Sequence, residues 1–229
     1  MILVFGGTTE GRKAVEVLEE AGTTYYYSTK TREQDITLHH GIRLDGALDA
    51  EAMRVFCQEH AIRLIVDAAH PFASQLHQTI AQVSETLNIP AIRYERIYPS
   101  RDSSITWIDD YSQVPTDIHS LLATTGVQSI SKLRYLEALG IKVLYRILNR
   151  ESSIQLAYQQ GVTDEQLCFY PKMAEAEAIL MKESGESGGF SEKIAEAKAL
   201  GMQIIALKRP HLSPLTSHLS TVLTDCVAW

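Results

Sequence analysis

A chain of 229 residues, of which 45% are hydrophobic and 21% charged, is long enough for one large or two small globular domains. Its apolar runs are far shorter than the roughly 18 residues of a membrane-spanning helix, so no membrane partner is expected. The formal net charge of −7 argues against a general nucleic-acid binder. The three cysteines, Cys57, Cys168 and Cys226, form no C-x-x-C pair, so neither a disulfide framework nor a metal site is expected, and a reducing cytoplasm is the expected location.

Strand-like and helix-like segments alternate along the first half of the chain. Residues 2–5 are apolar and lead directly into glycines, which predicts a buried strand rather than a signal peptide. We expect a helix from about 10 to 21, a strand over 24–28, a helix near 49–60 and a core strand over 63–68. Apolar residues recur every three or four positions over 72–87, which predicts a long helix, and a short strand should follow over 91–93.

The alternation restarts after a polar stretch at 111–119. Strands are expected over 121–123, 142–148, 167–169, 178–182 and 203–207, with helices over 131–139, 151–160 and 191–200. This pattern predicts an α/β fold of two units with mainly parallel sheets, divided as residues 1–115 and 116–229. Ligands of such sheets bind beyond the carboxyl ends of the strands, so the residues that end strands are the candidates for function.

The first strand ends in the turn GGTTEGR (6–12). It matches neither the dinucleotide fingerprint G-x-G-x-x-G nor the P-loop, because its glycines are Gly6, Gly7 and Gly11. Glycines allow a ligand to approach the backbone, and the N–H groups at a helix start favour an anion. The alternative is a plain tight turn in which Thr8 or Thr9 caps the helix.

The second strand ends in STKTR (28–32), where a typical NAD site carries an acidic residue. Hydroxyl groups and two cations suit the 2′-phosphate of NADPH instead. A solvated basic loop is the alternative.

Two further strand ends carry polar side chains. The segment DAAHPFA (67–73) places His70 at a strand tip, where a lone histidine is more often structural than functional. The segment RYER (93–96) is either a charged surface ladder or a set of cations that neutralises carboxylates.

The stretch KESGESGG (182–189) is a second glycine-rich segment, and Lys193 follows in the next helix. It is either an anion-binding nest or a flexible loop. One cofactor and one anionic substrate would account for all five strand ends. No Ser-His-Asp or paired-carboxylate arrangement is evident in the sequence. The chemically difficult step of the reaction is therefore expected to be carried out by a cofactor, as in hydride transfer.

These residues resemble the precorrin-6A reductases, including the cobalt-precorrin-6A reductases of cobalamin biosynthesis. The similarity runs nearly from end to end, in the same order as the family's motifs. It comprises GGTTEGR (6–12), Ser28 with Arg32, DAAHPFA (67–73), RYER (93–96), TTG (124–126), RIL (146–148), KESG with GG and Lys193, and Arg209-Pro210. The chain departs from the family at Ala69, at Lys30-Thr31, at 46–48, where many members carry more glycine, and in a shortened segment around 170–178.

The resemblance implies two Rossmann-like domains, an N-terminal dinucleotide-binding one and a C-terminal substrate-binding one, with the active site in the cleft between them. It also implies reduction of one carbon–carbon double bond of a carboxylate-bearing macrocycle by NADPH, with NADH possible. The candidate proton donor is His70, with water as a competitor. The expected cofactor-binding residues are Gly6, Gly7, Thr8, Glu10, Gly11, Arg12, Ser28, Lys30 and Arg32. The expected substrate-binding residues are Arg93, Arg96, Thr124, Thr125, Gly126, Arg146, Lys182, Ser184, Gly185 and Lys193.

Two other classes of protein remain open on the sequence. One is a non-catalytic dinucleotide sensor, and the other is a different nucleotide-dependent enzyme on a doubly wound fold. Cofactor oxidation that depends on the macrocycle separates the three, because a sensor does not turn over and another enzyme ignores the macrocycle. The sequence leaves open whether the substrate contains cobalt, and whether the protein is a monomer or a small homo-oligomer.

Overall fold

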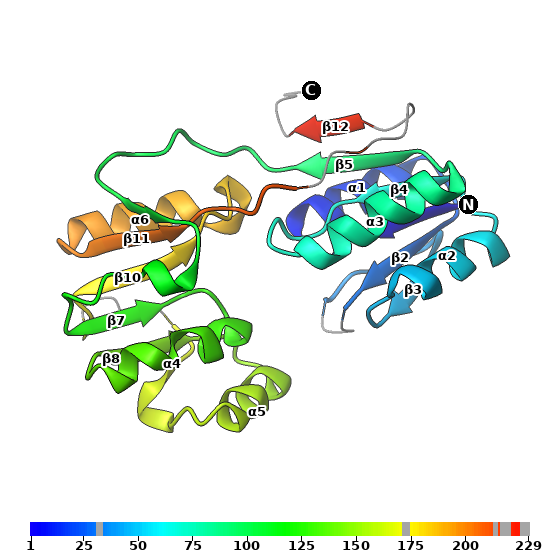
Figure 1. Ribbon diagram of the computed structural model, residues 1–229. Helices are drawn as coiled ribbons and strands as arrows, with labels where there is room; N and C mark the ends of the chain where they lie inside the picture. Colours follow the sequence, from blue (N-terminus) through cyan, green and yellow to red (C-terminus); the bar gives the residue numbers. More distant parts are fainter. Residues whose placement is uncertain (31–33, 171–174, 213–214, 216–220, 225–229) are drawn as a thin grey trace. The chain divides into compact units, whose positions relative to one another are not determined.

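The computed structural model describes residues 1–30, 34–170, 175–212, 215 and 221–224. The chain divides into two compact units, Met1–Ile97 with the segment from Pro210 onward, and Tyr98–Arg209 (Figure 1). Each contains one six-stranded sheet, and all neighbouring strands among the described residues are parallel. No helix in the described part of the chain is long and apolar enough to span a membrane.

The first unit is a doubly wound sheet with the strand order β12-β5-β4-β1-β2-β3. The chain builds outward from β1 to β3 and then returns to place β4 on the other side of β1, so the switch point lies between β1 and β4. Its elements are β1 (Ile2–Phe5), α1 (Thr9–Glu20), β2 (Tyr25–Thr29), β3 (Gly41–Asp45), α2 (Ala50–Glu59), β4 (Leu64–Asp67), α3 (Ser74–Leu87), β5 (Ala91–Glu95) and β12 (Thr221–Thr224).

Helices cover both faces of this sheet. On one face, Met53 and Cys57 of α2 and Ile80 and Val83 of α3 pack in one core with alternate residues of the strands. On the other, Val15 of α1 packs with a second core that includes Tyr25 and Tyr27. Covering both faces explains why β1 and β4 read as continuous apolar runs.

The second unit repeats this topology, with the order β6-β11-β10-β7-β8-β9 and a switch point between β7 and β10. The apolar side of α6 packs through Phe190 and Ala197 against one face of the sheet. The elements are β6 (Thr106–Ile108), η1 (Tyr111–Gln113), β7 (Ser120–Ala123), η2 (Val127–Ser129), α4 (Ile130–Ala138), β8 (Lys142–Arg146), α5 (Glu151–Gln159), η3 (Asp164–Gln166), β9 (Leu167–Cys168), β10 (Ala178–Lys182), η5 (Glu186–Gly188), α6 (Phe190–Ala199) and β11 (Gln203–Leu207).

The α/β fold of two Rossmann-like parallel sheets is confirmed, and the expected helices are present within one or two residues of their bounds. The units differ from the expected division between residues 115 and 116. The segment from 98 onward already belongs to the second unit, where β6 pairs with β11, and the chain returns after Arg209 so that β12 pairs with β5. The sixth strand of each sheet, β12 in the first unit and β6 in the second, is therefore a short segment from outside the strand–helix alternation of that unit.

Candidate active site

The glycine turn after β1 begins helix α1 at the switch point of the first unit. The Thr8 hydroxyl accepts a hydrogen bond from the Gly11 amide at 3.0 Å and donates to the carbonyl oxygen of Ala68 at 2.6 Å. Thr8 is thus the N-cap of α1 and also joins the turn to the end of β4. The interpretation of Thr8 as a helix cap is therefore correct. Capping does not prevent ligand binding, because the turn still places the N-terminus of α1 at the carboxyl ends of the strands.

Each of the three positions in this turn requires glycine for a different physical reason. A Cβ at Gly6 would lie 2.3 Å from the Tyr27 hydroxyl oxygen, and one at Gly11 would lie 2.7 Å from the Gly6 Cα. Gly7 has a φ of +87°, and a Cβ there would meet no atom within 4 Å. Its amide donates to the Tyr27 hydroxyl at 3.0 Å. Gly6 and Gly11 therefore allow close internal packing, and Gly7 is the position with open space for a ligand.

The neighbouring end of β2 carries the residues expected near a 2′-phosphate. Ser28 is buried, and its carbonyl oxygen accepts from the Gly6 amide at 3.0 Å, whereas Lys30 is exposed. Arg12, in the first turn of α1, is also exposed. Arg32 lies outside the described residues.

The end of β4 carries a buried network around Asp67. The Asp67 carboxylate accepts from Arg93 Nε at 3.1 Å and pairs with His77 Nδ1 at 2.7 Å. His70 is partly exposed, and its Nδ1 accepts from the Phe72 amide at 3.2 Å, so a neutral His70 ring carries its proton on Nε2.

Arg96 forms a second buried ion pair, with Glu10 of α1, in which both side chains are at most 5% exposed. The sequence assigned Arg93 and Arg96 to substrate carboxylates and Glu10 to the cofactor. The structure pairs both guanidinium groups with carboxylates of their own unit. Asp67 and His77 were missed as the partners in this network, although Asp67 lies in a quoted motif.

In the second unit, the candidates lie at the ends of three successive strands, β10, β7 and β8. After β7, the Thr124 amide and hydroxyl both donate to the carbonyl oxygen of Leu180, and the hydroxyls of Thr125 and Ser129 are 2.6 Å apart. Gly126 has a φ of +87°, and a Cβ there would meet no atom within 4 Å. This turn therefore matches the glycine turn in both topological position and open backbone.

Two pairs of cations lie near the carboxyl edge of this sheet. Burial and then repulsion from Lys132 lower the pKa of Lys182, and burial and then repulsion from Arg146 lower the pKa of Lys193, with Glu192 partly opposing. Lys193 lies on the helix after β10 and interacts with the end of β8, so the cluster spans the carboxyl edge of the sheet. Lys132, in the first turn of α4, was missed by the sequence analysis. We call Lys132, Arg146, Lys182 and Lys193 the cation cluster.

The loop between Lys182 and α6 is ordered by its own contacts. Ser184 is buried and donates to the carbonyl oxygen of Gly188 at 3.3 Å, and Gly185 has a φ of +72°. Glu183 is 1% exposed and accepts hydrogen bonds from the side chains of Arg101 and Arg209. The one carboxylate in this loop's KESG segment is thus directed to two arginines outside the cation cluster.

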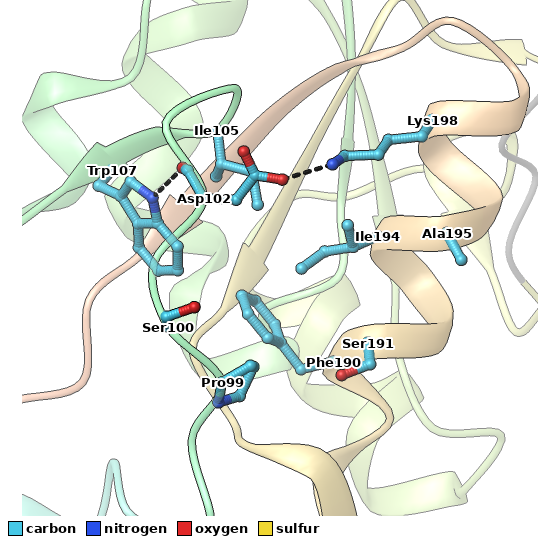
Figure 2. Close-up of a pocket in the computed structure, with 10 residues that line it drawn as sticks. All are labelled: Pro99, Ser100, Asp102, Ile105, Trp107, Phe190, Ser191, Ile194, Ala195 and Lys198. Atoms are coloured by element: carbon cyan, nitrogen blue, oxygen red, sulfur yellow. Dashed lines mark hydrogen bonds and ion pairs between the residues drawn. The ribbon is translucent and has the colours of Figure 1, made fainter.

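A separate cavity of 340 Å³ lies between α6 and the segment 99–107 (Figure 2). Its walls include Trp107, Phe190 and the ion pair between Asp102 and Lys198. None of the expected site residues lines this cavity. In the part of the chain that the structure describes, no group of three or more His, Cys, Asp or Glu side chains is placed to hold a metal ion.

Comparison with known proteins decides the family. The model of the family described as Precorrin-6x reductase CbiJ/CobK matches residues 1–228. The chain belongs to this family. A cobalt-precorrin-6A reductase of Synechocystis is 26% identical, with 98% of this chain and 95% of the relative covered. A precorrin-6A reductase of Rhodococcus erythropolis is 27% identical, with 100% and 96% covered.

A solved structure supports the fold independently. The structure described as CobK precorrin-6A reductase superposes with a TM-score of 0.72 at 17% identity, covering 93% of this chain and 89% of that one. Family membership identifies this protein as an oxidoreductase of cobalamin biosynthesis that acts on a CH–CH group with a nicotinamide cofactor.

Proposed function

We propose that this protein reduces precorrin-6A or its cobalt-containing form with NADPH in the cytoplasm, with the cofactor in the first unit and the macrocycle carboxylates held by the second. The names of its relatives support the substrate class. The observation that supports the assignment of the units is the contrast in their cations: Arg93 and Arg96 are buried in ion pairs, whereas the cation cluster gathers like charges at a strand edge.

A nicotinamide cofactor fits the glycine turn. Gly7 leaves room for a pyrophosphate, the N-terminus of α1 supplies positive potential, and Lys30 and Arg32 suit a 2′-phosphate. When bound, the cofactor supplies the hydride. The protein residues bind the cofactor and orient the substrate, and His70, in its imidazolium form, is the proposed proton donor.

The cation cluster fits an anion of high charge. Bringing lysines together and burying them disfavours their charged forms, which is why their pKa values are lowered. Carboxylates of a bound macrocycle would offset both the repulsion and the lost solvation. The amides of Thr125 and Gly126, in the turn after β7, add backbone donors at the strand edge that carries Lys182 and Arg146.

The test is oxidation of NADPH by purified protein with and without the macrocycle. We expect oxidation only when the macrocycle is present, and faster with NADPH than with NADH. Cofactor binding without turnover would instead indicate a sensor. Running the cobalt-free and cobalt-containing macrocycles in parallel distinguishes the two substrates.

A further inference from the structure

His77 is the buried group at the end of β4 for which the proposed reaction has no role so far. It is 2% exposed in α3, with Nδ1 2.7 Å from an Asp67 carboxylate oxygen and Nε2 3.0 Å from the main-chain oxygen of His70. A carbonyl oxygen only accepts, so Nε2 donates. Asp67 also accepts from Arg93, so Nδ1 faces an acceptor as well. Both ring nitrogens of His77 therefore face acceptor oxygens, one on a side chain and one on the main chain.

The His77 side chain holds the backbone of the turn that carries His70. The carbonyl group fixed by His77 belongs to His70 itself, and the His70 ring is oriented by the Phe72 amide at Nδ1. On the other side, the carbonyl group of Ala68 is fixed by Thr8 of the glycine turn. The turn is thus clamped between α3 and the glycine turn.

We propose that His77 is a positioning residue. Its hydrogen bonds to Asp67 and to the main-chain oxygen of His70 hold the His70 imidazole in the orientation needed to deliver a proton. The proposal rests on the assignment of His70 as proton donor in the proposed reaction. Structural support for the turn needs only one neutral donor. A fully buried ring that shares one carboxylate with Arg93 is a more elaborate arrangement than that support requires.

The kinetic test uses His77→Gln and His77→Phe in the full-length protein, with His119→Gln as the matched control. His119 is also paired with a carboxylate but is 96% exposed in its side chain. We expect kcat to fall about ten- to a hundredfold in both His77 variants, because small misplacements of a reacting group have effects of this size. The KM for the macrocycle and the Kd for NADPH should change little, and His119→Gln should match the wild type.

His77→Gln retains one or two amide donors and should therefore keep more activity than His77→Phe. Unchanged kcat in a folded His77→Phe protein would overturn the proposal. So would a parallel loss of NADPH affinity, which would place the effect in the cofactor turn. If His77→Phe does not fold, the ranking of wild type, His77→Gln and His70→Gln decides: His77→Gln must lie between the other two in kcat.

A second measurement does not depend on turnover. The ¹⁵N shifts of His77 at pH 7 should show both nitrogens protonated, and His77→Gln should broaden or shift the His70 ring signals. A ring with only one protonated nitrogen would overturn the inference that His77 donates to Asp67 and to the His70 main-chain oxygen at the same time. If the wild type shows this signature but does not oxidise NADPH with the macrocycle, the proposed function fails and the hydrogen-bond clamp stands.

Discussion

The two units repeat one topology, and the turns after the equivalent strands β1 and β7 share an open glycine with a φ of +87°. Their surroundings are opposite in charge balance. In the first unit, Glu10 and Asp67 neutralise the arginines at the strand ends. In the second, the cation cluster brings like charges together at the carboxyl edge of the sheet, and the buried carboxylate of Glu183 is bound to Arg101 and Arg209 instead.

The fold therefore supplies the backbone of an anion site twice, and the pairing or clustering of the nearby charged side chains determines what each site binds. A pyrophosphate carries only two negative charges, which the N–H groups of a helix N-terminus can accommodate. A macrocycle with many carboxylates requires cations. Breaking the buried ion pairs of the first unit should therefore lower the stability of the fold. Removing cations of the second unit should weaken binding of the substrate.

The largest effect is expected from Glu10→Gln. It removes the carboxylate that pairs with buried Arg96, and loss of one partner of a buried ion pair destabilises by about 3–5 kcal/mol. Urea unfolding should show this loss, and Glu10→Gln/Arg96→Met should recover part of it. Asp45→Asn, which breaks the more exposed pair with Arg43, should change the free energy of unfolding far less. Equal losses in the two single variants would contradict the distinction.

Lys182→Ala should damage the reaction with macrocycle and spare NADPH binding. A desolvated charge pair contributes about 2–5 kcal/mol, so kcat/KM for the macrocycle should fall at least tenfold. Lys193→Ala should act in the same direction. Lys142→Ala, at the exposed amino end of β8, is the control and should have no effect. Lost NADPH affinity with unchanged macrocycle kinetics would reverse the assignment of the two units.

The same cluster predicts a pH effect with a definite sign. Because the pKa values of Lys182 and Lys193 are lowered, these lysines lose their protons at a lower pH than exposed lysines do. As pH rises, kcat/KM for the macrocycle should fall before the ordinary lysine pKa is reached, since this ratio reports the free enzyme. In Lys182→Ala the fall should be smaller. A pH profile identical to that of the wild type would show that Lys182 is not the titrating group.

The sequence predicted the core of this fold because buried parallel strands are apolar runs and amphipathic helices have a clear period. It missed β3, β6 and β12. β6 has three residues and β12 four, and both are contributed from outside the local alternation, so no local pattern marks them. Arg93 and Arg96 show the limit at the site: strand-end cations suggest ligands, but their partners Asp67 and Glu10 are 26 and 86 residues away. Only the tertiary structure reveals that these charges are already paired.

Cofactor preference should depend on Lys30 and Arg32. A hydrogen bond to a charged group contributes about 1.5–3 kcal/mol, so NADPH should bind at least tenfold more tightly than NADH. Lys30→Ala and Arg32→Ala should reduce this difference in affinity between NADPH and NADH, and they should leave the affinity for NADH unchanged. Arg63→Ala, at the opposite end of the sheet, should leave it unchanged. A wild type that prefers NADH in competition would refute the 2′-phosphate assignment and leave the reductase function intact.

The smallest effects on stability should come from three alanine substitutions that compare the two turns directly. Gly7, Gly126 and Gly22 all have positive φ, and a Cβ at each would meet no atom within 4 Å. Each substitution should therefore cost about 1–3 kcal/mol of backbone strain without a steric clash. Their effects on ligand binding should differ. Gly7→Ala should weaken binding of NADPH, and Gly126→Ala should weaken binding of the macrocycle. Gly22→Ala, at the far end of α1, should weaken the binding of neither ligand. Isothermal titration with both ligands and urea unfolding on all three proteins makes the comparison. If Gly126→Ala weakens NADPH instead, the cofactor belongs to the second unit, and the shared backbone geometry of the two turns would have been assigned the wrong way round.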